Sequence, residues 1–186
     1  MKRKAVFLDR DGIINVDHGY VYKPEDFEFI DGVFDACRHF HQLGYLLIVV
    51  TNQSGIARGM YTEQDFQALT RWMQARFAEE GAPITHVYHC PHHPDFGSEA
   101  DRNCDCRKPM PGMLDRAITE YNLNPATCMM VGDKESDMRA AQQASIKKLF
   151  FFSSTKSDRI LGSYQNFSTW QEIQQKVVSS ESTGPT

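Results

Sequence analysis

Short apolar runs alternate with longer stretches of helical periodicity along this chain. Three runs are continuous and end at polar residues: 5–8, 46–50 and 128–131. Two weaker runs lie at 86–89 and 149–152. Because apolar residues stand at consecutive positions rather than at every second one, we expect strands that are buried on both faces, as in a parallel sheet.

The stretches between these runs place apolar residues on one face of a helix. Residues 33–43 show this spacing, and Gly44 follows as a stop signal. Thr62 and Asp65 suit the first turn of the next predicted helix. The same spacing predicts helices over 66–77, 113–121, 138–144 and 170–177.

Strands that alternate with helices imply a doubly wound α/β fold, in which helices flank a Rossmann-like parallel sheet on both faces. We expect a single domain over residues 1–178. Residues 179–186 are mostly small and polar, so we expect them to form a disordered tail.

The composition is ordinary for a globular domain that folds around its own core: of 186 residues, 41% are hydrophobic and 24% charged. The net charge of −4 argues against a general nucleic-acid binder. The longest apolar run, 45–50, is far too short for a membrane span, and charged residues at 9–11 interrupt any signal peptide. We therefore expect a cytoplasmic monomer with no nucleic-acid or membrane partner.

Acidic residues follow two of the predicted strands. Asp9 and Asp11 come directly after the first strand, and Asp133 follows the run at 128–131. Ligands bind beyond the carboxyl ends of strands in such sheets, so we expect these acids to converge. Three acids repel one another unless a cation lies among them, and Mg²⁺ suits such an all-oxygen site. Asp-x-Asp-Gly alone is also compatible with a turn or a helix cap, whereas Tyr20 stands where a calcium loop needs Glu.

The five cysteines are unevenly placed. Their odd number argues against a disulfide framework. Cys90 and His92 form one close pair, and Cys104 and Cys106 form another. Three thiols and one imidazole form a common closed zinc set, so we expect a structural zinc ion and a zinc-bound loop. The alternative is a group of buried or free thiols.

Four ordered motifs carry a resemblance to a known family. They are 6–12 (Val-Phe-Leu-Asp-Arg-Asp-Gly), 49–55 (Val-Val-Thr-Asn-Gln-Ser-Gly), 107–109 (Arg-Lys-Pro) and 131–137 (Val-Gly-Asp-Lys-Glu-Ser-Asp). Together they resemble the motifs of the haloacid dehalogenase (HAD) phosphohydrolase superfamily and span most of the chain. The resemblance implies the HAD fold and phosphate-ester hydrolysis.

The resemblance also implies a role for each acid. Asp9 would be the nucleophile that forms an aspartyl-phosphate. Mg²⁺ would be held by Asp9, the backbone carbonyl of Asp11 and Asp133. Asp11 would protonate the leaving alkoxide and then deprotonate water, and we expect the neighbouring Asp9 anion to raise its pKa.

Two further residues would bind the phosphoryl oxygens as their charge changes. The resemblance assigns this task to Thr51 and Lys108. Asp137, close after Asp133, would brace the loop rather than bind metal.

The predicted zinc loop, residues 90–106 (the cysteine loop), narrows the resemblance to one branch of the superfamily. A zinc loop before Arg-Lys-Pro is similar to the branch that contains heptose bisphosphate and histidinol-phosphate phosphatases. Residues 15–21, 53–59 and 90–94 resemble the heptose side, which implies removal of the 7-phosphate from a heptose 1,7-bisphosphate, in the supply of activated heptose for lipopolysaccharide. Histidinol-phosphate hydrolysis, hydrolysis of polynucleotide 3′-phosphates and a non-catalytic phosphate-binding module are the alternatives, and the acidic net charge weighs against the polynucleotide.

The gaps between the motifs leave no room for a cap domain, so loops must recognise the sugar bisphosphate. Arg107 can bind a second phosphate bidentately; a surface salt bridge is its alternative. The complete set of candidate substrate contacts is Asp17, His18, Gly19, Tyr20, Asn52, Gln53, Ser54, Arg107 and Lys134.

Overall fold

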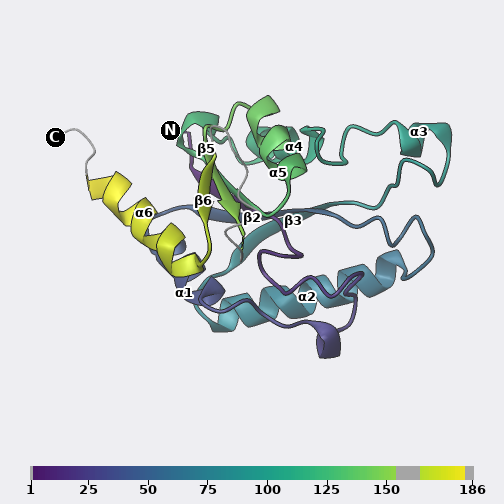
Figure 1. The fold of residues 1–186 in the computed structure, drawn as a ribbon, viewed down its shortest axis with the longest axis horizontal. Helices are drawn as coiled ribbons and strands as arrows, with labels where there is room; N and C mark the ends of the chain where they lie inside the picture. The colour runs from purple at the N-terminus through teal and green to yellow at the C-terminus, as the bar shows by residue number, and fades with distance from the viewer. Residues whose placement is uncertain (1, 154–163, 183–186) are drawn as a thin grey trace.

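The structure, a computed structural model, describes residues 2–153 and 164–182 (Figure 1). The strands are β1 (Ala5–Leu8), β2 (Leu46–Asn52), β3 (Ile84–Cys90), β4 (Met129–Gly132), β5 (Lys148–Phe152) and β6 (Gln165–Phe167). The helices are α1 (Val33–Gln42), α2 (Glu63–Glu79), α3 (Glu99–Arg102), α4 (Gly112–Glu120), α5 (Glu135–Gln143) and α6 (Trp170–Ser182), with 3-10 turns η1 (Pro24–Asp26) and η2 (Pro125–Thr127). Among these helices, none is long and apolar enough to cross a membrane.

The described strands form one parallel sheet in the order β3-β2-β1-β4-β5-β6. The predicted doubly wound fold is therefore confirmed. The chain builds outward from β1 in one direction through β2 and β3, and in the other through β4, β5 and β6. The order reverses between β1 and β4, and in open α/β sheets such a reversal marks the ligand site.

Each face of the sheet is covered by helices, and alternate residues of β1 point to opposite faces. Val6 and Leu8 belong to the core under α1, α2 and α6, whereas Ala5 and Phe7 belong to the core under α4 and α5. Figure 1 shows α4 and α5 above the strands and α1 and α2 below them. Because both faces are buried there, β1, β2 and β4 carry continuous apolar runs, as the sequence predicted.

Several elements differ from their predicted bounds or were not predicted. β2 continues through Thr51 and Asn52, because both pair with β3. β6 and α3 were missed, since both are short and mostly polar. Helix α6 continues to Ser182, so a tail beginning at residue 179 was wrong for 179–182; residues 183–186 lie outside the described part of the chain.

Candidate active site

The candidate site lies at the carboxyl ends of β1 and β4. Asp9 follows β1, Asp133 follows β4, and Asp137 lies in the first turn of α5. One carboxylate oxygen from each lies within 4.8 Å of the others. The fold therefore brings Asp9 and Asp133 together, as predicted, and adds Asp137.

Lys108 supplies the positive charge of this cluster. Its ammonium lies 3.0 Å from Asp9 Oδ1 and 2.6 Å from Asp137 Oδ1, and it donates a hydrogen bond to the Val50 carbonyl at 2.8 Å. Burial lowers the pKa of Lys108, but Asp137 and Asp9 outweigh burial and raise it overall. Lys108 is thus a buried permanent cation beside the predicted nucleophile.

One lysine does not neutralise the negative charge of these three acids. Burial and then repulsion from Asp137 raise the pKa of Asp9 to about 7, despite the attraction of Lys108. Burial, the largest cause, raises the pKa of Asp133 to about 6. Asp133 Oδ1 is buried, and no residue in the described ranges donates a hydrogen bond to it. An excess of buried carboxylates with an orphan oxygen fits a divalent cation with oxygen ligands.

Gly12 allows the Asp133 carboxylate to approach the β1 loop. Its φ is +86°, and a Cβ on Gly12 would overlap the carboxylate of Asp133. Only glycine combines this left-handed conformation with an open Cβ position. The glycine in Asp-x-Asp-Gly is therefore required by both the turn and the neighbouring acid.

Asp11 lies in different surroundings from the other acids. Arg10 Nη2 donates to Asp11 Oδ1 at 2.9 Å and to Oδ2 at 3.0 Å, Asn15 Nδ2 donates to Oδ1 at 3.0 Å, and Gln53 Nε2 donates to Oδ2 at 3.0 Å. Burial raises the pKa of Asp11, but Arg10 and these hydrogen bonds lower it overall. The expectation that Asp9 raises this pKa was wrong, because the carboxylate faces donors rather than the acid cluster.

The end of β2 supports Lys108 from beneath. Asn52 Nδ2 donates to the Lys108 carbonyl at 3.1 Å, and Asn52 Oδ1 accepts from the Lys108 backbone N–H at 3.0 Å. Thr51 is buried, and its Oγ1 accepts from Gln53 at 2.8 Å. Asn52 therefore holds the lysine in register with β2, in addition to lining the site.

One cavity of about 380 Å³ contains most of the predicted groups. It is lined by Asp9, Asp11, Asn52, Ser54, Arg107, Lys108, Pro109, Lys134, Ser136 and Asp137. Lys134 Nζ also lies 3.5 Å from Asp17 Oδ2, so the β1 and β4 loops meet at the rim. Two cations and Lys108 thus face the acids, an arrangement suited to a substrate with more than one phosphate.

The remaining predicted substrate contacts lie elsewhere. His18, Gly19 and Tyr20 line a separate hollow with Glu25, Asp26 and Glu28. His18 pairs with Glu28 at 3.1 Å, and the Tyr20 hydroxyl accepts from Arg58. The structure does not bring these three residues into the catalytic cavity, and Gln53 is buried beneath Asp11.

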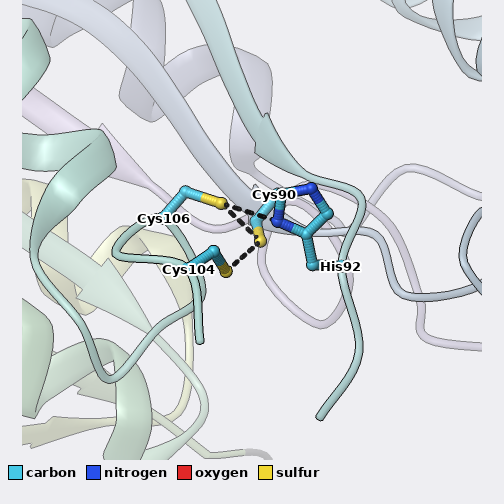
Figure 2. A group of neighbouring side chains, drawn as sticks. All are labelled: Cys90, His92, Cys104 and Cys106. Carbon is cyan, nitrogen blue, oxygen red and sulfur yellow. Dashed lines mark hydrogen bonds between the residues drawn. The ribbon is translucent and has the colours of Figure 1, made fainter. Parts of the chain in front are cut away.

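The four predicted zinc ligands do come together (Figure 2). Cys90 Sγ lies 3.7 Å from Cys104 Sγ and 2.7 Å from Cys106 Sγ, and Cys106 Sγ lies 3.5 Å from His92 Nδ1. Burial raises the pKa of Cys104, but hydrogen bonds from His92 and the Arg107 backbone lower it to about 7. Three sulfurs and one nitrogen, all within 4.8 Å, fit a tetrahedral zinc ion.

The cysteine loop is connected to the cavity. His92 Nε2 lies 3.3 Å from Asp101 Oδ1, which leaves Nδ1 toward the sulfurs. Asp101 and Ser98 cap α3 reciprocally. Arg107 Nη1 donates to the His92 carbonyl at 3.1 Å, so the same histidine that faces the cysteines holds the cation that lines the cavity.

Sequence reasoning missed the residues that surround Asp11. Arg10 carries a weak signal, because a cation between two acids is an obvious partner. Asn15 carries no signal as a partner of Asp11, since that contact comes from the fold. Ser136 also lines the cavity and was passed over within the fourth motif.

The family follows from comparison with known proteins. Residues 3–145 match the model of the haloacid dehalogenase-like hydrolases. The chain belongs to this family. The HAD-like hydrolase is 56% identical over 143 residues to D-glycero-beta-D-manno-heptose-1,7-bisphosphate 7-phosphatase of Yersinia pestis, covering 76% of each chain, and 52% identical over 145 residues to that of Pasteurella multocida, covering 78% of this chain and 79% of the relative.

Solved structures of heptose bisphosphate phosphatases share the fold of this chain. The D,D-heptose 1,7-bisphosphate phosphatase from B. bronchiseptica, complexed with magnesium and phosphate, superposes with a TM-score of 0.83 at 26% identity, over 96% of this chain and 99% of that one. The corresponding enzyme from Burkholderia Thailandensis has a TM-score of 0.68 at 22% identity, over 96% and 99%, and supports the fold alone.

Proposed function

We propose that this HAD-like hydrolase removes the 7-phosphate of D-glycero-D-manno-heptose 1,7-bisphosphate, in the supply of activated heptose for lipopolysaccharide. The observation that carries the proposal is one cavity in which Asp9 and Lys108 meet two further cations, Arg107 and Lys134. Asp133 lies beside Asp9 in the acid cluster. Lys108 lies beside the nucleophile, so Arg107 and Lys134 remain for a second phosphate. The names of the relatives, which specify the β anomer, supply the sugar.

In the first step, Asp9 attacks phosphorus. A bond forms between its carboxylate oxygen and phosphorus, and the bond from phosphorus to the sugar oxygen breaks. Lys108, 3.0 Å from Asp9, offsets negative charge where it builds up. Asp11 in its protonated form gives the departing alkoxide its proton.

In the second step, water replaces Asp9. The ionised Asp11 takes a proton from the water, whose oxygen bonds to phosphorus while the Asp9–phosphorus bond breaks, and inorganic phosphate leaves. The donors around Asp11 and its lowered pKa describe this ionised form. This ionised form is the one that the second step needs, whereas the first step needs Asp11 to be protonated.

Two metals complete the proposal. Mg²⁺ would be held by Asp9, Asp133 and the Asp11 carbonyl; when bound, it neutralises charge on the carboxylates and the phosphate. Asp137 contacts Lys108 and accepts from the Lys134 backbone N–H at 3.0 Å, so we assign it to bracing. Zn²⁺ would be held by Cys90, His92, Cys104 and Cys106 and would support the loop that carries Arg107.

Phosphate release from the heptose bisphosphate tests the proposal. We expect Mg²⁺-dependent release with both anomers assayed, the β anomer preferred, and little release from histidinol phosphate. Asp9→Asn should lower release about a thousandfold or more, because the nucleophile is lost. Equal rates for the wild type and Asp9→Asn would instead favour a non-catalytic binding module, and a preference for histidinol phosphate would favour that alternative.

Recognition of the second phosphate is tested separately, by a substitution at Arg107. Arg107→Ala should raise KM for the heptose bisphosphate about ten- to hundredfold, because a charge-assisted hydrogen bond to phosphate is lost. KM for heptose 7-phosphate should change little. An equal rise in KM for the two substrates would show that Arg107 does not recognise the 1-phosphate.

A further inference from the structure

Gln53 occupies an unusual place for a residue in a substrate-binding motif. Its side chain is buried, with only 2% of the residue exposed. Gln53 Nε2 donates to Asp11 Oδ2 at 3.0 Å and to Thr51 Oγ1 at 2.8 Å. The Tyr61 hydroxyl donates to Gln53 Oε1. All of its side-chain polar atoms are therefore committed to protein groups.

The chemistry of these groups permits one orientation of the amide. An ionised carboxylate only accepts hydrogen bonds, so the NH₂ of Gln53 must face Asp11 and its carbonyl must face Tyr61. The Tyr61 hydroxyl must then donate. Burial, the largest cause, raises the pKa of Tyr61 to about 12, so the hydroxyl keeps the proton that it donates.

Tyr61 is itself fixed by its surroundings. It is buried, and its ring stacks on Tyr22 at 5.4 Å between centroids, with the planes 11° apart. A Cβ on Gly55 would overlap the Tyr61 ring, so the ring reaches Gln53 only because residue 55 lacks a side chain. The loop after β2 thus delivers both the amide and the group that orients it.

Asp11 is consequently held from two sides of the cavity. Arg10 and Asn15, from the β1 loop, contact Oδ1, and Arg10 also contacts Oδ2. Gln53, from the β2 loop, contacts Oδ2. The β2 contact ties the carboxylate to Thr51, and hence to the strand end that supports Lys108.

We propose that Gln53 and Tyr61 are positioning residues for the acid/base Asp11, rather than substrate contacts. Tyr61 fixes the Gln53 amide, and the amide fixes the Asp11 carboxyl for proton transfer to and from the sugar oxygen and water. This inference rests on the proposed function. It predicts that substituting Gln53 or Tyr61 slows a reaction more when the leaving group needs a proton from Asp11.

The leaving group separates this role from a merely structural one. p-Nitrophenolate leaves without a proton, whereas the alkoxide of a sugar does not. The value of kcat/KM reports steps only up to release of the first product, so the later water step does not enter. Tyr61→Phe should lower kcat/KM for D-glycero-β-D-manno-heptose 1,7-bisphosphate about tenfold, and that for p-nitrophenyl phosphate less than about twofold.

Tyr22→Phe is the matched control. It removes a hydroxyl from the ring stacked on Tyr61 and leaves the bond from Tyr61 to Gln53 in place, so we expect both substrates to be unaffected. Gln53→Met removes the amide while keeping a side chain of similar length, and should reproduce the selective loss. Melting temperatures of all variants show that they are folded.

A double-mutant cycle tests whether the effect passes through Asp11. Adding Tyr61→Phe to Asp11→Asn should lower kcat/KM for the heptose bisphosphate less than twofold further, because the group being positioned is gone. Independent, multiplying losses would overturn the inference, as would equal losses with the two substrates. If the wild type hydrolyses neither substrate, the proposed function fails; if it hydrolyses both and Tyr61→Phe is unselective, only this inference fails.

Discussion

Replacing Asp9 by Asn should destroy activity yet stabilise the metal-free protein. Asp9 is 5% exposed and shares its surroundings with Asp133 and Asp137, with Lys108 as the nearby cation. Asn has the same size and can still accept the hydrogen bond from Lys108, but it carries no charge to desolvate. Lys108 also keeps Asp137 at 2.6 Å, so it is not left unpaired.

The size of the effect follows from the pKa. Burial and repulsion from Asp137 raise the pKa of Asp9 from 3.8 to about 7, which corresponds to a cost of about 4 kcal/mol for ionising it in the folded state. Relaxation of the cluster reduces that cost. We therefore expect a gain in unfolding free energy of about 1 to 4 kcal/mol at pH 8, or at least about 3 °C in melting temperature.

The dependence on pH has a definite sign. Between pH 4 and 7 the folded state keeps the Asp9 proton and the unfolded state loses it, so the wild type loses stability as pH rises through this window. Asn does not titrate. The advantage of Asp9→Asn should therefore be greatest at pH 8 and should narrow steadily toward pH 5.

Thermal unfolding followed by circular dichroism, without Mg²⁺ and at several pH values, measures both effects. Added Mg²⁺ should raise the melting temperature of the wild type more than that of the variant, because a carboxylate ligand is missing. A variant that is less stable than the wild type at pH 8, or an advantage that widens toward pH 5, would refute the charge-repulsion argument.

The remaining predictions concern the metal loop and the β1 turn. Cys104→Ser should reduce zinc content, measured by elemental analysis, from about one ion per chain to near none, whereas Cys128→Ser, in the core outside the cluster, should keep zinc; equal zinc in both would contradict the ligand set. Gly12→Ala should abolish phosphate release, because its Cβ would overlap the Asp133 carboxylate. Gly59→Ala, also at positive φ but with nothing within 4 Å, should cost only about 1 kcal/mol of stability and remain active; similar activities for the two would refute the role of close approach.

Much of the fold and of the acid cluster could be read from sequence because the signals are local. Continuous apolar runs such as 46–50 predict strands buried on both faces, and polar residues at strand ends predict the site. Asp9 and Asp133 meet because parallel strands place their carboxyl ends on one edge. The zinc ligands could be predicted for a similar reason, since close pairs of cysteine and histidine have few other uses.

The tertiary structure alone decided what surrounds each acid. Asp9 and Asp11 are two residues apart, yet the pKa of Asp9 is raised and that of Asp11 is lowered. The difference comes from Arg10 first, then from Asn15 and Gln53, which all donate to Asp11, whereas Asp137 repels Asp9. The distance of Gln53 from Asp11 depends on strand register and on the path of the β2 loop. A pKa depends on charges and donors within a few ångströms, whatever their separation along the chain. Sequence therefore determined which chemical groups are present and at which edge of the sheet they gather, and packing determined which of them can hold, give or take a proton.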